Sequence, residues 1–214
     1  MQTNQFHQYT QEFWDERYGS TDRVWSGRPN AALVAEATDL PPGTALDVGC
    51  GEGADAIWLA GRGWRVTATD VSDVALRRGA AHDPARLIDW QRVDLRDWEP
   101  DGPGYDLVSA QFVLHFPAEL HPERDRLFAR LAAAVAPGGQ LVVVGHSVLD
   151  MGTTIPRPPD TSLFFTADDL AAQLDPAVWT VCTADIRPRP WTHDGREVLL
   201  HDAVLRAQRS AETG

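Results

Sequence analysis

Three glycines and an aspartate near residue 50 have the types and spacing of a site for a small charged ligand. Gly49, Gly51 and Gly53 lack a β-carbon, so the backbone can turn sharply and a ligand can lie directly against the main chain. An apolar run before the turn predicts a buried strand, and the pattern after it predicts a helix that begins near Ala54. The backbone N–H groups of such a helix start favour an electron-rich group. The stretch therefore predicts a cofactor site.

Two classes of cofactor fit this glycine spacing. Gly49, Gly51 and Ala54 satisfy the G-x-G-x-x-G/A pattern of dinucleotide sites, and Asp70 lies at the right distance downstream. Asp47, inside the predicted strand, separates the two classes. A buried negative charge gains nothing beside a dinucleotide phosphate, whereas an ammonium group gives it a partner. A nicotinamide-dependent oxidoreductase remains the alternative interpretation.

The sequence LDVGCGEG, residues 46–53, resembles the first motif of the class I S-adenosylmethionine (SAM) methyltransferases, and the resemblance extends over about residues 10 to 208. It implies that SAM is the cofactor and that Asp47 lies near its ammonium group. It also implies that Gly49 to Gly53, with Cys50 among them, line the cofactor.

The end of a second predicted strand, WRVTATD, carries the next candidate. A carboxylate at Asp70 can accept both hydroxyl groups of a ribose, and Val71 follows it at the same edge of the sheet. The alternative is that Asp70 caps the following helix, although Ser72 or Asp73 can do so instead.

Three further residues follow or end predicted strands. By resemblance, Asp94 receives the adenine amino group and Leu95 flanks the ring; the alternative for Asp94 is a solvated carboxylate in a turn. Gln111 emerges over the site from a fourth strand, because ligands bind at the carboxyl ends of parallel strands.

The N-terminal segment, residues 1–40, predicts two helices and is rich in Trp, Tyr and Arg. It resembles the cap of small-molecule and tellurite-resistance-type methyltransferases, which helps to close the cofactor site. On that resemblance Arg17 binds the methionine carboxylate and Trp25 lies over the pocket. The alternative is an amphipathic helix that docks its aromatic side chains.

Two histidines fall on the side of the sheet where an acceptor must lie. His115 follows the fourth strand and His146 ends the fifth, so each is a candidate general base, with a packing role as the alternative. A base is needed if the acceptor carries a proton, and alignment suffices for an acceptor that is already an anion. The irregular segment 150–164 is interpreted as a loop beside the acceptor, with Arg157 and Phe164 among its lining candidates; the alternative is a plain surface connection.

Composition narrows the function classes. The formal charge of −12 argues against a nucleic-acid partner, and because all 19 basic residues are Arg, lysine Schiff-base and Walker-type phosphate chemistry are excluded. Cys50 and Cys182 have neither metal-ligand nor disulfide spacing, so no metal site is expected and the reducing cytoplasm is the expected compartment. We find no signal peptide and no apolar run that could cross a membrane.

The expected fold is α/β: a Rossmann-like, seven-stranded, mostly parallel sheet in the order 3-2-1-4-5-7-6, with helices on both faces. A terminal antiparallel hairpin distinguishes it from a plain dinucleotide fold. Residues 1–40 are expected as a helical cap of the same domain, 41–208 as the methyltransferase domain and 209–214 as a frayed tail.

The expected function is methyl transfer from SAM to a small molecule, at an oxygen, nitrogen or sulfur atom, by in-line displacement. A non-catalytic SAM-binding protein is the second alternative, and the sequence gives no oligomeric state.

Overall fold

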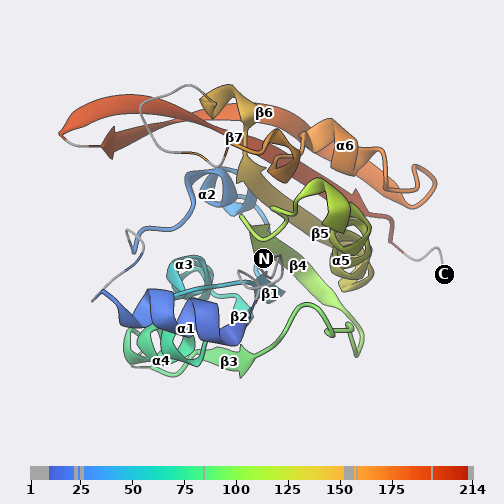
Figure 1. Ribbon diagram of the computed structural model, residues 1–214. Coiled ribbons are helices and arrows are strands. Elements are labelled where there is room, and N and C mark those ends of the chain that lie inside the picture. The colour runs from blue at the N-terminus through green and yellow to red at the C-terminus, as the bar shows by residue number, and fades with distance from the viewer. Residues whose placement is uncertain are drawn as a thin grey trace.

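A seven-stranded sheet occupies the centre of the structure, and the chain enters it after two short helices (Figure 1). The computed structural model describes residues 10–21, 24, 27–83, 85–151, 157, 159–193 and 195–211, without the side chain of His193. In chain order the elements are α1 (Gln11–Gly19), α2 (Ala31–Ala37), β1 (Thr44–Val48), α3 (Ala54–Gly61), β2 (Arg65–Asp70), α4 (Asp73–Ala81), β3 (Ile88–Arg92), β4 (Tyr105–Gln111), η2 (Ala118–Leu120), α5 (His121–Ala133), β5 (Val135–His146), η3 (Val148–Asp150), η4 (Thr161–Leu163), α6 (Ala167–Ala171), β6 (Trp179–His193) and β7 (Arg196–Arg209).

The strands lie in the order β3-β2-β1-β4-β5-β7-β6. Strands β1 to β5 pair in parallel, and β7 runs antiparallel to both of its neighbours, β5 and β6. The predicted strand order and terminal hairpin are therefore confirmed. Because the first five strands share one direction, their carboxyl ends meet at one edge of the sheet.

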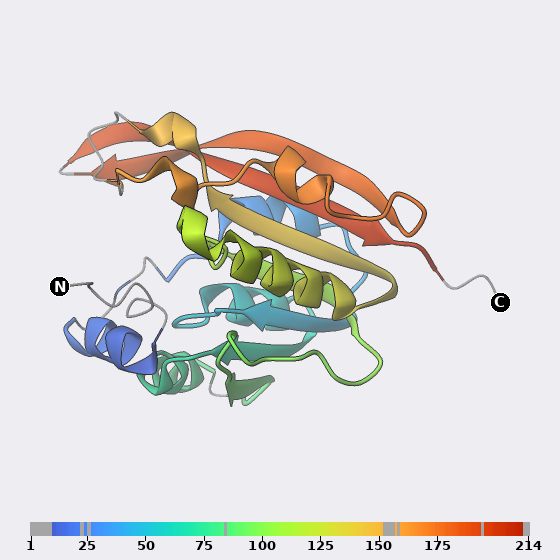
Figure 2. The same ribbon diagram turned by 45° about the vertical axis from the view of Figure 1, so that its right-hand side comes forward.

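Alternating side chains place helices on both faces of the sheet. In β5, Leu141 and Val143 join the core cluster of α5 and α6, whereas Val142 and Val144 join that of α2 and α3. Figure 2 shows α5 and α6 in front of the sheet and α2 and α3 behind it. No helix in the described ranges is long and apolar enough to span a membrane.

Polar side chains fix the starts of the helices. Asn30 Oδ1 accepts the Ala32 N–H at 2.8 Å and caps α2, and Ser72 Oγ accepts the Ala75 N–H at 3.1 Å and caps α4. Thr166 starts α6 with a capping box. The cap of α4 is thus Ser72, which leaves Asp70 to other contacts.

The first strand of the terminal hairpin passes through two prolines. Strand β6 continues beyond Pro188 through Pro190 to His193, because β6 is the edge of the sheet and an edge strand tolerates the missing N–H of proline. The chain after β7 is also still tied to the sheet, since the Ser210 N–H donates to the Val178 carbonyl at 2.8 Å.

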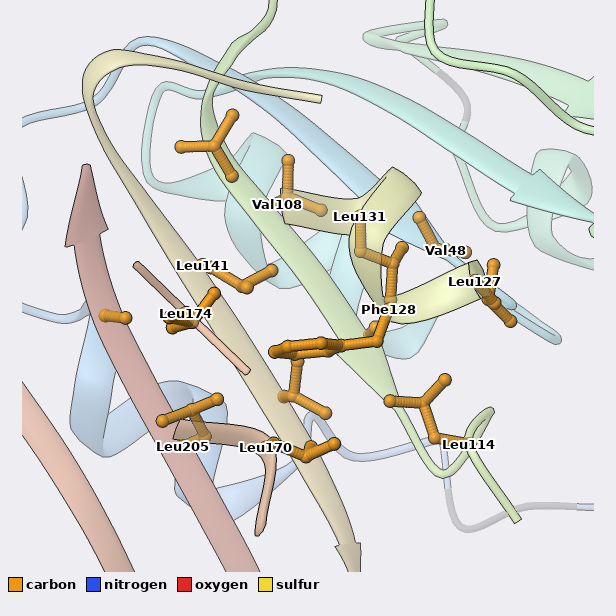
Figure 3. Packing of buried hydrophobic residues seen from close by; sticks show 14 of the residues in the cluster. Val48, Val108, Leu114, Leu127, Phe128, Leu131, Leu141, Leu170, Leu174 and Leu205 are labelled. Atoms are coloured by element: carbon orange, nitrogen blue, oxygen red, sulfur yellow. The ribbon is translucent and has the colours of Figure 1, made fainter. Parts of the chain in front are cut away.

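Phe128 anchors the core on the α5 face. It is 1% exposed, and Figure 3 shows its side chain pointing from α5 toward Leu141 and Leu170. Phe128→Ala should lower the free energy of unfolding by about 3 to 5 kcal/mol, because it leaves a cavity that the sheet cannot fill. Urea denaturation measures this. Arg126→Ala, on the exposed side of the same helix, should change it by less than about 0.5 kcal/mol, and equal effects would contradict the packing described here.

Candidate functional site

The glycine turn between β1 and α3 has the backbone that its sequence predicts. Gly49, Gly51 and Gly53 have φ of +67°, +55° and +79°, which side-chain-bearing residues rarely adopt. A Cβ on Gly49 would collide with the side chain of Val113, and a Cβ on Gly53 would collide with the ring of Trp90. The Cys50 N–H donates to the Thr69 carbonyl at 2.9 Å, which fixes the turn beside β2.

Asp47 is a carboxylate buried in the middle of the sheet. It is 2% exposed in β1, between β2 and β4, and the Ala56 N–H and the Ser109 hydroxyl partly offset the effect of burial on its pKa. Its Oδ2 atom is buried without a partner among the described residues. Burial raises the pKa of Asp47 well above its usual value, and the neighbouring Asp55 and Asp70 raise it further. A bound cation would offset the cost of burying the Asp47 charge and its repulsion by Asp55 and Asp70.

Asp70 ends β2 beside the turn. Its Oδ2 accepts the Gly51 N–H and its Oδ1 accepts the Ser72 N–H, both at 2.9 Å. Burial raises the pKa of Asp70, against the lowering effect of these N–H groups. Each carboxylate oxygen can accept a second hydrogen bond, so Asp70 retains acceptor capacity for a ligand.

Two acids of the glycine turn and α3 hold the N-terminal segment in place. Asp55 Oδ1 accepts the Asn30 N–H at 2.6 Å, and Glu52 Oε2 accepts the Val24 N–H at 3.2 Å. Burial raises the pKa of Asp55 to about 6. Val24 and Asn30, between α1 and α2, are therefore bonded to the glycine turn and to the start of α3.

Two further contacts complete this attachment. Arg78 on α4 pairs with Glu52 at 3.1 Å and donates to the Thr21 carbonyl at 2.6 Å. On α1, Asp15 accepts a hydrogen bond of 2.6 Å from the hydroxyl of Ser72, which lies two residues after Asp70. Glu52, Asp55 and Asp15 were not predicted from the sequence, because most of their partners are distant in the chain and several are backbone groups.

The other predicted cofactor residues lie in varied surroundings. Arg17 is exposed on α1, with its guanidinium 5.8 Å from the Trp14 ring centroid, and Trp25 lies outside the described residues. Asp94 pairs with Arg96 (Nε to Oδ1, 2.9 Å). Val71 is half-buried after β2, and Leu95, beyond the end of β3, packs against the α5 core. Gln111 ends β4 and donates to the Ser109 hydroxyl at 3.0 Å. Its Oε1 atom is buried without a partner among the described residues.

The two candidate histidines are neighbours at the carboxyl ends of β4 and β5. The His146 N–H donates to His115 Nε2 at 3.1 Å, and His115 Nδ1 lies 3.0 Å from the Phe112 carbonyl. Since Nε2 accepts, the proton of the neutral ring is on Nδ1. Phe112 has a φ of +60°, and its ring centroid lies 4.4 Å from that of His146. Burial lowers the pKa of both histidines, that of His146 to about 2, where His115, Arg157 and Arg189 add to the effect.

Two arginines paired with buried acids lie beside these histidines. Arg157 Nη2 donates to Asp150 at 3.1 Å, and Arg189 Nε donates to Asp202 at 2.5 Å. Asp150 also accepts from the Nδ1 of His201 at 2.9 Å. Arg157 was predicted as a lining residue of the acceptor side, and so was Phe164, whose ring centroid lies 6.4 Å from that of His115.

The sequence analysis missed Arg189, Asp202 and His201. They lie in the terminal hairpin, where period-2 patterning predicts strands but not which charges meet across the pair. The signal that could have found them is the alternation of arginines with prolines and an aromatic residue in RPRPW, residues 187–191.

Comparisons with known proteins agree with this geometry. A family model described as a methyltransferase domain matches residues 46–141, which include β1, the glycine turn and β4. Trans-aconitate 2-methyltransferase of Rhizobium meliloti is 36% identical over 128 residues, which is 59% of this chain and 47% of that protein. The uncharacterized methyltransferase Rv0089 of Mycobacterium tuberculosis is 36% identical over 126 residues, covering 58% of this chain and 61% of that protein.

A solved structure, from work on the conversion of a disulfide bond into a thioacetal group during echinomycin biosynthesis, superposes with a TM-score of 0.71 at 26% identity, over 95% of this chain and 94% of that one. The chain spans 47% and 61% of the length of the two curated relatives. The matched region contains the acid and the glycines that carry the resemblance, and the sheet has the family's terminal antiparallel hairpin. Residues 46–141 therefore match a methyltransferase domain, and the fold and the relatives together support a class I, S-adenosylmethionine-dependent methyltransferase.

Proposed function

We propose that the protein transfers the methyl group of SAM to a small-molecule acceptor by in-line displacement. The observation that carries this proposal is Asp47, a buried carboxylate with an unpartnered oxygen at the start of the glycine turn. An ammonium group bound there supplies the countercharge that Asp47 lacks. The overall charge of −12 supports a small molecule rather than a nucleic acid as acceptor.

The residues present fit SAM at several points. Asp47 would hold the ammonium group, and Asp70 would accept the ribose hydroxyls. The turn from Gly49 to Gly53, which includes Cys50 and three glycines without a Cβ, would lie along the methionine half. In this proposal the adenosine end is bound by Val71, Asp94 and Leu95, and the remaining contacts come from Arg17, Trp25 and Gln111.

The bound cofactor supplies a methyl group that the sulfonium already makes electrophilic, so the protein mainly aligns the acceptor and excludes water. The contacts of Asp55 with Asn30 and of Glu52 with Val24 hold the N-terminal segment against the glycine turn. We propose that this segment is the cap of the site. Cys50 and Cys182 are both unpaired, which suits the cytoplasm as the compartment.

The first prediction concerns the choice of cofactor. Both SAM and its demethylated product S-adenosylhomocysteine should bind and release or absorb heat in calorimetry, whereas NADH should not bind. A dinucleotide would bring phosphate charge toward Asp47 and its acidic neighbours. Binding of NADH without binding of SAM at millimolar concentration would refute the proposed function.

The second prediction concerns Asp70. Asp70→Ala should weaken SAM binding by about 2 to 4 kcal/mol, or roughly two to three decades in Kd, because two ribose hydroxyls lose a charged acceptor in a buried place. Asp73→Ala is the matched control, since Asp73 is only part-buried and bonds Gln11 and Arg92 instead. If calorimetry gave equal losses for the two variants, Asp70 would not be a ribose ligand.

The third prediction concerns pH. Asp55 has a pKa of about 6 and adds to the pKa of Asp47, so protonation of this pair removes the negative charge that attracts an ammonium group. SAM affinity should therefore be full above about pH 7 and fall as pH decreases through about 6, approaching tenfold in Kd per pH unit for one proton. In Asp55→Asn the decline should move to lower pH, because Asp47 loses a like-charged neighbour. A Kd constant from about pH 5 to 8 in both proteins would contradict this account.

A further inference from the structure

Two guanidinium groups converge on one place at the acceptor end of the sheet. Arg189, on β6, lies 6.0 Å from the Phe112 ring centroid, which is 4.4 Å from that of His146. Arg157, between η3 and η4, bonds Asp150, which also bonds His201, the residue before the Asp202 that pairs with Arg189. The side chains of Arg157 and Arg189 are 12% and 20% exposed, so they are largely withdrawn from solvent. In a chain with a net charge of −12, such a pair of cations beside a candidate acceptor site indicates recognition of an anion.

Each guanidinium is oriented by a buried acid and keeps further N–H groups. Asp150 is fully buried behind Arg157, and Asp202 is 1% exposed behind Arg189. Arg157 Nε is buried without a hydrogen-bond partner in the described part of the chain. The Arg189 guanidinium lies 6.0 Å from the Phe112 ring centroid. Among the described residues, it donates a hydrogen bond to Asp202 through Nε. A guanidinium has five N–H groups in a planar fork that matches a carboxylate.

Neither neighbouring histidine is suited to remove a proton. His115 uses Nε2 to accept the His146 N–H and Nδ1 to donate to Phe112. His146 has a buried Nδ1 atom without a partner among the described residues, and its pKa of about 2 keeps it from holding a proton near neutral pH. An acceptor that arrives as an anion needs no base.

On the basis of the function proposed above, we propose that the acceptor is an organic carboxylate, held by Arg157 and Arg189 beside His146, and that one of its carboxylate oxygens receives the methyl group. A lone pair of that oxygen forms the new O–CH₃ bond, and the S–CH₃ bond breaks with its electron pair left on sulfur. The carboxylate becomes a neutral methyl ester and the sulfonium becomes a neutral thioether. No proton is taken up or released.

This chemistry has a defined pH dependence. The titratable and charged groups at this end of the sheet are Arg157, Arg189, Asp150, Asp202, His115, His146 and His201. With saturating SAM, turnover should fall below about pH 5 as the acceptor carboxylate protonates, and stay level from about pH 6 to 8. A histidine that acted as a general base would instead give a rate that rises through the histidine range.

The test uses the full-length protein and SAM with a labelled methyl group. The acceptor probes are trans-aconitate, aliphatic and aromatic mono- and dicarboxylates with their neutral amides, and a small-molecule cell extract separated into anionic and non-anionic pools. Methyl esters release labelled methanol in mild alkali, whereas methyl ethers, amines and thioethers do not. We expect label from acids or the anionic pool alone, all of it labile to alkali, with no proton released in unbuffered solution.

Arginine variants then test whether Arg157 and Arg189 bind the acceptor. Arg157→Lys and Arg189→Lys keep the charge opposite Asp150 and Asp202 but lose the fork, so KM for the acceptor should rise about tenfold or more while the Kd for SAM stays within about twofold. Arg126→Lys, exposed on α5, is the control and should change neither. Thermal melting verifies that all variants are folded.

Alkali-stable label, a released proton, or a rate that depends on a histidine-range pKa would overturn this inference and leave the proposed function intact. Unchanged KM in both arginine variants would also overturn it. If SAM bound but no probe or pool gained label, the proposed function itself would fail, and the inference with it.

Discussion

The buried carboxylate of Asp47 is the interaction on which the site depends. Strands β2 and β4 enclose it, and Asp55 and Asp70 add negative charge nearby, so the ligand-free turn carries an unfavourable concentration of charge. The same acids also stabilise the local structure. Asp70 accepts backbone N–H groups that shape the turn, and Asp55 fixes the start of α2. Binding of a cation and attachment of the N-terminal segment are therefore linked through a few carboxylates.

Much of the fold could be predicted because its signals are local. The apolar run before Gly49 and the helix that begins near Ala54 each follow from neighbouring residues, and crossover rules then restrict the strand order. The full length of β6 could not be predicted. Pro188 and Pro190 read as a strand end until the topology shows that this strand lies at the edge of the sheet.

The site could be predicted where residue type and strand position together specify a role, as for Asp47 and Asp70. The acceptor end was predicted less completely, because its charges come from β5, a loop and the hairpin, and only tertiary pairing brings Arg189 and Asp202 together. The sequence also placed His146 at a strand end, where a base could lie. Its environment depends on the ring of Phe112 and on two distant arginines, which lower its pKa and change its expected chemistry.

The edge position of β6 has a consequence for association between molecules. An exposed edge strand offers N–H and C=O groups to any further strand that approaches it, and this is a common route to aggregation. Pro188 and Pro190 each remove one N–H donor from β6, on either side of Arg189, which donates to Asp202. A strand of a second molecule that approached β6 would find two backbone donors missing here, which disfavours edge-to-edge pairing along this part of the hairpin.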